Sequence, residues 1–325
     1  MMKYGNVAGV DKKISRICQG GIMFSQENLD HAFALMDAAR EIGINCIDCA
    51  WIYGGDGDCE KTIGKWVASR GNRDEFVMFD KGAHPMEEFG RISPEMITEE
   101  LNTSLDRLGF DYIDIYCLHR DDLSIPVDEM VDCLNGHKDA GLINAFGGSN
   151  WTAKRVAEAN AWAAKNGKTG FAVSSPQFSL AEMYNPIWWG CLGLGGAAQV
   201  EDRKFYAEND IPIFSWSSIG CGFFTGKVTS DNAEAMKANL EPDVVKAFYG
   251  EENFRRLDRA YEMAAEKGLT VTQMALAYVL NQAPLKTHPF VGPLTVDEVK
   301  GLEMVVDVEL TAKETAWLDL QSDER

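Results

Sequence analysis

Short apolar runs rich in β-branched and aromatic residues alternate with longer stretches of helical periodicity along most of the chain. Strands that alternate with helices of about 10–15 residues are typical of βαβ units and of a parallel sheet. The pattern therefore predicts an α/β fold. The candidate strands cover residues 14–20, 45–49, 76–81, 112–119, 142–147, 172–178, 211–215 and 288–291.

The predicted helices begin and end at residues with known terminal preferences. Ser93 and Pro94 form an N-cap followed by a first-turn proline, and Gly109 ends the same helix. Between them, leucine and isoleucine recur every three or four positions, which indicates one buried face. Further helices are predicted over residues 126–141, 152–167, 257–268, 271–280 and 296–305.

The eight strand–helix units favour a closed (β/α)8 TIM barrel that forms a single domain over residues 1–325. No linker or change in composition divides the chain. The alternative, an open doubly wound sheet, would need a glycine-rich dinucleotide turn after its first strand, whereas residues 20–23 read Gly-Gly-Ile-Met. In a barrel, the loops at the carboxyl ends of the strands form the active site, and three of them are long: residues 82–93, 179–202 and 226–248.

The net charge of −19 and the pI near 4.7 argue against binding to nucleic acids or to anionic membranes, because both need basic surfaces. No stretch approaches the ~18 consecutive apolar residues of a transmembrane helix. The first 13 residues lack the apolar core of a signal peptide. We therefore expect a cytoplasmic protein.

The eight cysteines include one C-x-x-C spacing, Cys46 and Cys49, which suits either a redox pair or two structural thiols. Residues three apart on a strand point to opposite faces, and no second pair would complete a zinc site. We therefore expect structural thiols in a reducing compartment and no metal.

Four polar residues lie where candidate strands end. Asp48, Lys81 and His119 each follow an apolar run, and Tyr53 lies five residues beyond Asp48 in the adjoining loop. If the barrel forms, all four lie on the same rim.

Together these four groups suit proton transfer. A free tyrosine has a pKa of about 10, so it needs charged neighbours to act as an acid at neutral pH. Lys81 and Asp48 would form a partly buried ion pair, and the ammonium would lower the pKa of Tyr53. His119 would orient a substrate carbonyl or share the proton. Tyr53 would then protonate the oxygen as a hydride arrives on carbon.

Residues 43–54, followed by Glu60 and Gly64, resemble the signature of the aldo-keto reductase family. Residues 114–119, 147–151, 174–177, 216–219 and 222–227 resemble its later motifs, and the order matches from about residue 13 to 320. The resemblance implies a (β/α)8 barrel that reduces an aldehyde or ketone with NAD(P)H. It also implies that Asp48, Tyr53, Lys81 and His119 form the catalytic tetrad, with Tyr53 as the general acid.

The resemblance further implies which residues hold the cofactor. Ser149, Asn150 and Gln177 fall where the family binds the nicotinamide carboxamide, and Trp216 falls where a ring stacks on the nicotinamide. Near the pyrophosphate fall Ser217, Ser218, Gly220, Gly222 and Lys227.

Two departures from the family pattern concern the cofactor. Cys221 stands where the family often has an arginine, and Gly292, Leu294 and Glu298 follow the last strand, where the family often has a basic residue for the adenosine 2′-phosphate. Because Leu294 is uncharged and Glu298 would repel a phosphate, we expect NADH to be accepted.

Candidate substrate residues are Trp51, Trp151, His84 and Arg120, with Arg91 as a further polar contact. Tryptophan faces suit sugar rings or flat aromatic groups, although amphipathic packing explains them equally well. We expect a polar carbonyl substrate, such as a sugar-derived aldehyde or ketone. Trp188 and Trp189 could instead pack against a neighbouring subunit, so the protein is expected to be a monomer or a small homo-oligomer.

Two other functions stay open. One is a regulatory or redox-sensing relative that binds the cofactor with little turnover. The other is a metal-dependent hydrolase or isomerase on the same barrel. The second needs clustered histidines on the rim, and the five histidines are scattered.

Overall fold

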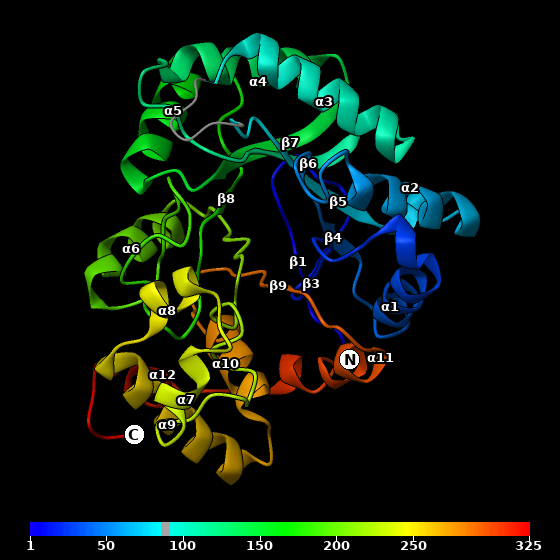
Figure 1. Cartoon of the computed structure of the whole chain (residues 1–325). Helices are drawn as coiled ribbons and strands as arrows, with labels where there is room; N and C mark the ends of the chain where they lie inside the picture. Colours follow the sequence, from blue (N-terminus) through cyan, green and yellow to red (C-terminus); the bar gives the residue numbers. More distant parts are fainter. Residues whose placement is uncertain (86–91) are drawn as a thin grey trace. The chain divides into compact units, whose positions relative to one another are not determined.

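The computed structural model describes residues 1–85 and 92–325, and Figure 1 shows its helices and strands. Contacts between residues divide the chain into two units. The N-terminal unit contains residues 2–175 and 292–300, and the C-terminal unit contains residues 176–291 and 301–325, together with Met1. The single domain expected over residues 1–325 stays a prediction, which a single calorimetric unfolding transition would support.

Six strands of the N-terminal unit lie side by side in the order β8-β7-β6-β5-β4-β3, and each neighbouring pair is parallel. Parallel neighbours bring all their carboxyl ends to one edge of the sheet. The strands are β3 (Cys18–Gly20), β4 (Cys46–Asp48), β5 (Val77–Gly82), β6 (Ile113–Leu118), β7 (Ile143–Ser149) and β8 (Val173–Ser175).

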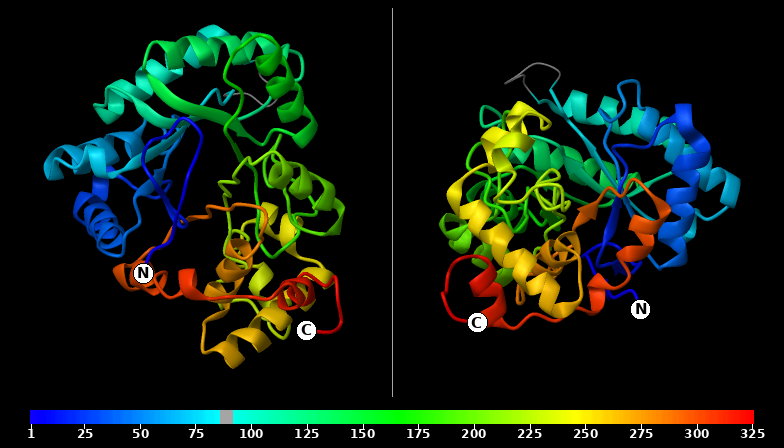
Figure 2. Two further views of the ribbon diagram at one scale, coloured as in Figure 1. Left: turned by 180° about the vertical axis from the view of Figure 1, so that it is seen from behind. Right: turned by 60° about the horizontal axis from the view of Figure 1, so that its bottom comes forward.

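A helix follows each of the first five of these strands, as the alternating pattern predicted. The helices are α1 (Leu29–Glu41), α2 (Asp58–Arg70), α3 (Pro94–Leu108), α4 (Val127–Asp139) and α5 (Ala153–Lys165). The views in Figure 2 show them along one side of these strands. The predicted ends of α3 are confirmed. The Ser93 side chain accepts a hydrogen bond from the Met96 N–H, and Gly109 adopts a left-handed conformation with a φ of 68°.

The first predicted strand, over residues 14–20, is wrong in its extent. It is divided into β2 (Ile14–Ser15), which pairs antiparallel with β1 (Tyr4–Gly5), and β3 of the parallel sheet. The side chain of Asn45 fixes the break, because its Oδ1 accepts from the Ser15 N–H and its Nδ2 donates to the Lys13 carbonyl oxygen.

The C-terminal unit is mostly helical. The segment predicted as a strand over residues 211–215 makes only an isolated bridge, but its backbone alternates hydrogen bonds with residues 286–290, including Ile213 N–H to Lys286 O at 2.8 Å. The elements of this unit are α6 (Val200–Glu208), α7 (Ala233–Lys237), α8 (Pro242–Phe248), α9 (Glu251–Lys267), α10 (Val271–Leu280), β9 (Phe290–Val291) and α12 (Ala312–Leu318).

Two further predictions about this part of the chain need correction. The stretch over residues 226–248, predicted as irregular, contains α7 and α8. The helix predicted over residues 296–305 ends early, as α11 (Val296–Gly301), and a short 3₁₀ turn over Val305–Asp307 follows. Short helices of five to seven residues give too little periodicity to be recognised in the sequence.

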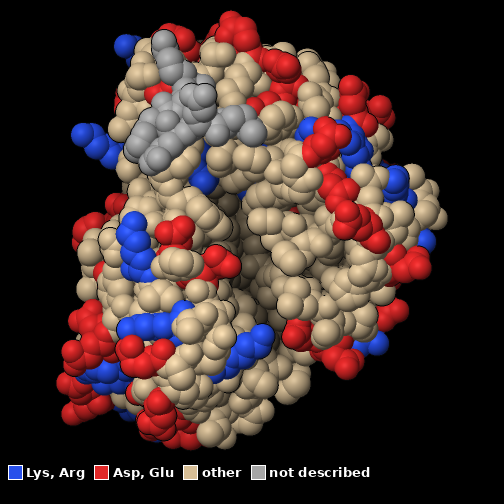
Figure 3. Space-filling view, viewed as in Figure 1, with Lys and Arg blue, Asp and Glu red and all other residues tan. Residues whose placement is uncertain are grey.

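Acidic residues are spread over the face of the molecule that Figure 3 shows, without gathering in one patch, and Lys and Arg lie between them. This distribution suits a solvated surface better than a site for one anionic or cationic partner. Within residues 1–85 and 92–325, no helix is long and apolar enough to cross a bilayer.

Candidate active site

The four predicted catalytic residues lie together at one edge of the N-terminal unit's sheet. Asp48 is the last residue of β4, Lys81 is the penultimate residue of β5, and His119 follows β6 directly. The parallel register aligns these ends, since Asp48 is opposite Phe79 and Lys81 is opposite Cys117. The carboxyl edge of the strands therefore brings together groups that are far apart in the sequence.

Lys81 connects these groups. Its Nζ donates a hydrogen bond to Asp48 Oδ1 and another, of 2.6 Å, to the Cys49 carbonyl oxygen. The same Nζ lies 4.9 Å from the centre of the Tyr53 ring. The Tyr53 ring meets the His119 imidazole edge to face, with 5.9 Å between their centres. Lys81 is 1% exposed, so its interactions are screened little by water.

The Lys81–Asp48 pair is ionised at neutral pH. Burial by itself lowers the pKa of Lys81, but the Asp48 carboxylate and Tyr53 outweigh burial, and the net pKa is raised. Burial raises the pKa of Asp48 to about 6, although Lys81 acts in the opposite direction. With these pKa values, both groups are charged near pH 7. The pair stays together because separating two buried charges costs free energy.

The expected fall in the pKa of Tyr53 does not occur. Burial raises its pKa above the ordinary value, and the nearby Lys81 ammonium, which also hydrogen-bonds the phenol, only partly opposes this effect. The sequence argument counted the charge and omitted the desolvation of the phenolate. Tyr53 is therefore fully protonated at neutral pH, which is the form that a proton donor needs.

His119 is neutral at the same pH. Burial, together with Lys81 and Arg120, lowers the pKa of its imidazole well below the ordinary value. Its Nδ1 is buried and has no hydrogen-bond partner among the described residues. His84 contacts the same ring edge to face at 4.8 Å, and the His84 Nδ1–H donates to the Pro85 carbonyl oxygen at 2.9 Å. The neutral His119 imidazole therefore lies beside Tyr53, and His84, whose pKa is also lowered by burial, lies against His119.

Helix α3 fixes the loop that carries Tyr53. Arg107 Nη1 donates to the Trp51 carbonyl oxygen at 3.0 Å and to Glu60 Oε2 at 2.8 Å. The Trp51 N–H in turn donates to the Lys81 carbonyl oxygen at 2.7 Å. Glu60 therefore anchors α2 to α3 and has no contact with the reacting groups. The sequence analysis missed Arg107, although an arginine in the last turn of α3 was a visible signal.

The predicted substrate residues differ in exposure. Trp51 and His84 are partly exposed. Trp151 is 1% exposed, packs against Phe171 at 4.9 Å between ring centres, and donates its Nε1–H to the Arg120 carbonyl oxygen. Arg120 is also buried, with Nη1 donating to the His119 carbonyl oxygen. Trp51 and His84 are thus the better candidates for contact with a substrate. Arg91 lies outside the described residues.

The predicted carboxamide residues of the N-terminal unit lie at the end of β7. Ser149 Oγ donates to the Ser175 carbonyl oxygen at 2.8 Å. Asn150 Nδ2 donates to Ser149 Oγ at 3.1 Å and to the His119 carbonyl oxygen at 3.3 Å. Asn150 also has a positive φ of 60°, a backbone conformation that residues other than glycine rarely adopt. These bonds fix Ser149 and Asn150 next to His119.

The last predicted cofactor residues of this unit surround the start of α11. Gly292 and Leu294 are exposed, with Leu294 at 54%. Glu298 Oε2 accepts the Leu294 N–H at 2.7 Å, and the Glu298 N–H donates to Thr295 Oγ1. The Glu298 carboxylate thus hydrogen-bonds to the backbone of the turn that precedes α11.

In the C-terminal unit, Gln177 has one amide atom engaged and one without a partner. Its Nε2 donates to Ser179 Oγ at 2.9 Å, whereas its buried Oε1 accepts no hydrogen bond from the described residues. Trp216 is partly exposed and lies near Trp188, at 5.9 Å between ring centres and 32° between planes.

The backbone after Trp216 is unusual. Ser217, Gly220, Cys221 and Gly222 all have a positive φ, between 49° and 93°. Backbones with residues in this conformation form concave nests of N–H groups that bind anions. Ser218 is buried and donates to the Ser215 carbonyl oxygen at 2.9 Å. The Lys227 side chain is exposed.

A sequence profile of the aldo/keto reductase family matches residues 16–321. The chain belongs to this family. Its members act on small-molecule carbonyl substrates and use NAD(P)H, and relatives named as oxidoreductases support the same class for this aldo/keto reductase. The resemblance drawn from the motifs is therefore confirmed.

Curated relatives are similar over most of the chain. An uncharacterized oxidoreductase of Bacillus subtilis strain 168, YrpG, is 28% identical over 95% of this chain and 94% of its own. A probable voltage-gated potassium channel subunit beta of Oryza sativa subsp. japonica is 27% identical over 93% and 96%. The norsolorinic acid reductase stcV of Emericella nidulans is 28% identical over 95% and 78%.

A solved structure confirms the fold class of this aldo/keto reductase. The glycerol dehydrogenase AKR11B4 from Gluconobacter oxydans matches with a TM-score of 0.75, over 97% of this chain and 94% of that one. At 22% identity the likeness shows the fold alone, and it confirms the predicted (β/α)8 class.

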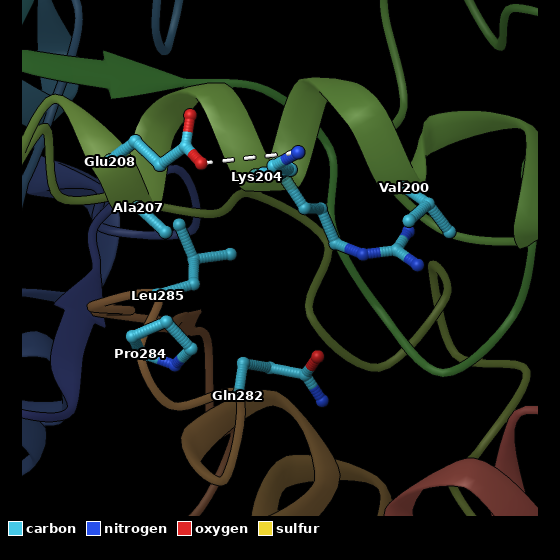
Figure 4. Close-up of a pocket in the computed structure, with 8 residues that line it drawn as sticks. Val200, Lys204, Ala207, Glu208, Gln282, Pro284 and Leu285 are labelled. Atoms are coloured by element: carbon cyan, nitrogen blue, oxygen red, sulfur yellow. Dashed lines mark ion pairs between the residues drawn. The ribbon is translucent and has the colours of Figure 1, made fainter.

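The C-terminal unit of this aldo/keto reductase also has a hollow away from the predicted residues. It has a volume of about 420 Å³ and lies between α6 and residues 282–285 (Figure 4). Its polar groups are engaged in part: Lys204 pairs with Glu208 at 3.9 Å, and Arg203 donates to the Leu194 and Gly196 carbonyl oxygens. None of the predicted catalytic or cofactor residues lines it.

Proposed function

We propose that the protein reduces an aldehyde or ketone to an alcohol by hydride transfer from NAD(P)H, with Tyr53 as the general acid. The observation that carries the proposal is the position of the buried Lys81 ammonium, paired with Asp48 and 4.9 Å from the Tyr53 ring. A fixed positive charge beside a phenol stabilises the phenolate that forms when the proton leaves, and it does so strongly where water is excluded.

Each residue has a distinct part in the proposed reaction. Tyr53 donates its hydroxyl proton to the carbonyl oxygen of the substrate. Lys81 stabilises the resulting phenolate, and Asp48 keeps Lys81 in place and charged. Neutral His119 presents a ring N–H to the substrate oxygen, so it orients the carbonyl while the proton comes from Tyr53.

Within each unit, residues fit the chemistry of a nicotinamide cofactor, which supplies the hydride when bound. The unpartnered Gln177 Oε1 is an acceptor suited to the N–H₂ of a carboxamide. The positive-φ backbone over residues 217–222 suits a pyrophosphate. We propose Ser149, Asn150 and Gln177 as carboxamide ligands, and Ser217, Ser218, Gly220, Gly222 and Lys227 as pyrophosphate ligands.

We expect NADH to be accepted. Leu294 brings no positive charge for an adenosine 2′-phosphate, and the Glu298 carboxylate would repel one. Steady-state rates with NADH and NADPH measure the preference as a ratio of kcat/KM. A preference for NADPH greater than about a hundredfold, or ~2.7 kcal/mol, would contradict the prediction.

Replacing Trp216 with leucine is expected to weaken cofactor binding about tenfold, because a stacked ring contributes ~0.5–1.5 kcal/mol beyond area burial. Fluorescence titration with NADH would measure the dissociation constant. Trp162→Leu, which removes a partly exposed ring on α5, is the matched control and should leave it unchanged. Equal affinities for wild type and Trp216→Leu would remove Trp216 from the proposed site.

We propose a polar carbonyl substrate, with Trp51 and His84 as its contacts. The names of related proteins span norsolorinic acid, aryl alcohols and glycerol, so they leave the substrate open within the carbonyl and alcohol class. Oxidation of NADH and NADPH against keto-sugars, aldoses and aromatic aldehydes would identify the class. We also propose that the protein is a monomer or a small homo-oligomer.

A second candidate function is a regulatory subunit that binds the cofactor with little turnover. The 27% identity to a probable voltage-gated potassium channel subunit beta supports it. The assembled proton-transfer groups favour the reductase, because a pure sensor does not need all four. Tight cofactor binding without turnover of any carbonyl in the panel would instead favour the regulatory function.

A further inference from the structure

Helix α3 carries a carboxylate on its buried face. Glu100 is 4% exposed and lies between Ile97, Leu101 and Ser104 on the side of the helix that faces the sheet. An ionised carboxylate in such a place is unfavourable unless hydrogen bonds or a cation compensate for lost hydration. Among residues 1–85 and 92–325, no ion pair involves Glu100. Its compensation therefore comes from elsewhere.

The compensation comes from the backbone that follows Lys81. The Ala83 N–H donates to Glu100 Oε2 at 2.6 Å. Burial raises the pKa of Glu100 to about 7, and the backbone N–H groups of Ala83 and His84 act in the opposite direction. Glu100 thus holds the Ala83 N–H by a hydrogen bond, and the His84 N–H that follows also stabilises its charged form.

That backbone is strained. Ala83 has a φ of 58°, in the left-handed region that residues with a Cβ rarely adopt. Such a conformation persists only where its surroundings impose it. The hydrogen bond from the Ala83 N–H to Glu100 is a direct means of imposing it.

The same backbone contacts two loops of the proposed active site, those that carry Trp51 and His119. The Gly82 carbonyl oxygen accepts the His119 N–H at 2.7 Å, and the Lys81 carbonyl oxygen accepts the Trp51 N–H at 2.7 Å. The strand end has little freedom to move, because even a methyl group on Gly82 would collide with the Tyr116 hydroxyl. A change at residues 82–84 would therefore displace Lys81 and His119 together.

We propose that Glu100 is a positioning residue for the reductase: by holding the Ala83 N–H, it sets the backbone at the end of β5 so that Lys81 meets Tyr53 and His84 meets His119. The inference rests on the proposed function, since it assigns Glu100 a part in the same reaction. Glu100 has no contact with the reacting groups, so its effect passes through the backbone.

The test compares four variants. Glu100→Ala removes the hydrogen-bond acceptor. Glu100→Asp keeps a carboxylate but shortens the side chain by one methylene. Glu100→Gln keeps the length and an oxygen that accepts a hydrogen bond from a backbone N–H. Leu101→Ala, next to Glu100 on the same buried face, is the control for loss of stability alone. For each, kcat and KM on a carbonyl that the wild type reduces, the dissociation constant of NADH and the Tm are measured.

For Glu100→Ala and Glu100→Asp we expect kcat to fall at least about tenfold, while KM and the NADH dissociation constant change less than about threefold, since small displacements of catalytic groups affect the chemical step. Glu100→Gln should keep kcat within about threefold of wild type. Leu101→Ala should lower the Tm and keep kcat. If Glu100→Ala does not fold, the kcat of Glu100→Asp is compared with that of Glu100→Gln instead.

Amide hydrogen exchange measured by NMR gives a readout independent of turnover. The Ala83 and His84 amides should exchange faster in Glu100→Ala or Glu100→Asp and stay protected in Glu100→Gln. Unchanged protection of both amides would overturn the proposal, and so would a kcat that falls equally in Glu100→Ala and Leu101→Ala. If the wild type reduces no carbonyl, the proposed function fails, while exchange still decides whether Glu100 holds this backbone.

Discussion

Replacing Tyr53 with phenylalanine is expected to lower kcat for carbonyl reduction by about 10²–10⁴-fold, the usual contribution of general acid catalysis. This loss corresponds to ~3–5 kcal/mol of activation free energy. Phenylalanine keeps the ring against His119 and under Lys81 and removes only the hydroxyl that carries the proton. KM and the NADH dissociation constant should change little, because the ring still fills its place.

The matched control is Tyr4→Phe. That tyrosine also uses its hydroxyl in a hydrogen bond, to the Gly43 carbonyl oxygen at 2.9 Å, but its side chain is exposed in β1. Its kcat should equal that of wild type, so a loss specific to Tyr53→Phe reports on proton donation. Full turnover of every tested carbonyl by Tyr53→Phe would show that Tyr53 is not the general acid.

Replacing Lys81 with methionine is expected to abolish most turnover and to lower the free energy of unfolding by about 3–5 kcal/mol at pH 8. The Asp48 carboxylate would remain buried without its cation, which is the costly case of a broken buried ion pair. Urea denaturation monitored by tryptophan fluorescence would measure the change in stability.

The destabilisation should depend on pH in a defined direction. The pKa of Asp48 is already raised to about 6 by burial, and the loss of Lys81 removes an influence that lowers it. A carboxyl whose folded pKa exceeds its unfolded value binds protons more tightly when folded, so the stability it contributes is present at low pH and is lost as pH rises through the folded pKa. The deficit of Lys81→Met relative to wild type should therefore be smaller at pH 5 than at pH 8.

Lys204→Met serves as the control, because Lys204 is exposed and pairs only at 3.9 Å with Glu208. Its free energy of unfolding should stay within about 0.5 kcal/mol of wild type. Equal deficits for Lys81→Met at pH 5 and pH 8 would contradict the assignment of the effect to Asp48.

The parallel sheet and its helices could be predicted from local signals. The cap at Ser93 and the stop at Gly109 depend only on neighbouring residues, and so does the apolar stripe between them. The strand predicted over residues 211–215 makes only an isolated bridge, for the opposite reason. Whether it forms a regular ladder depends on residues 286–290, which are distant in the sequence.

The candidate site was predictable in its residues and not in its electrostatics. Asp48, Lys81 and His119 stand at strand ends, and parallel strands bring such ends together. The partial burial of Tyr53 and the full burial of Trp151 were not visible, because they depend on which side chains surround each ring. For this reason the expected direction of the pKa shift of Tyr53 was wrong.

The sequence by itself determined the family, the alternation of strands and helices, and the residues that meet at the carboxyl edge of the sheet, because motifs and periodicity are local properties of a chain. Only the tertiary structure decided that Tyr53 keeps its proton, that Arg107 holds the loop at Trp51, and that Glu100 accepts a hydrogen bond from the backbone after Lys81. Desolvation and hydrogen bonds between distant segments exist only after packing, so no local pattern encodes them.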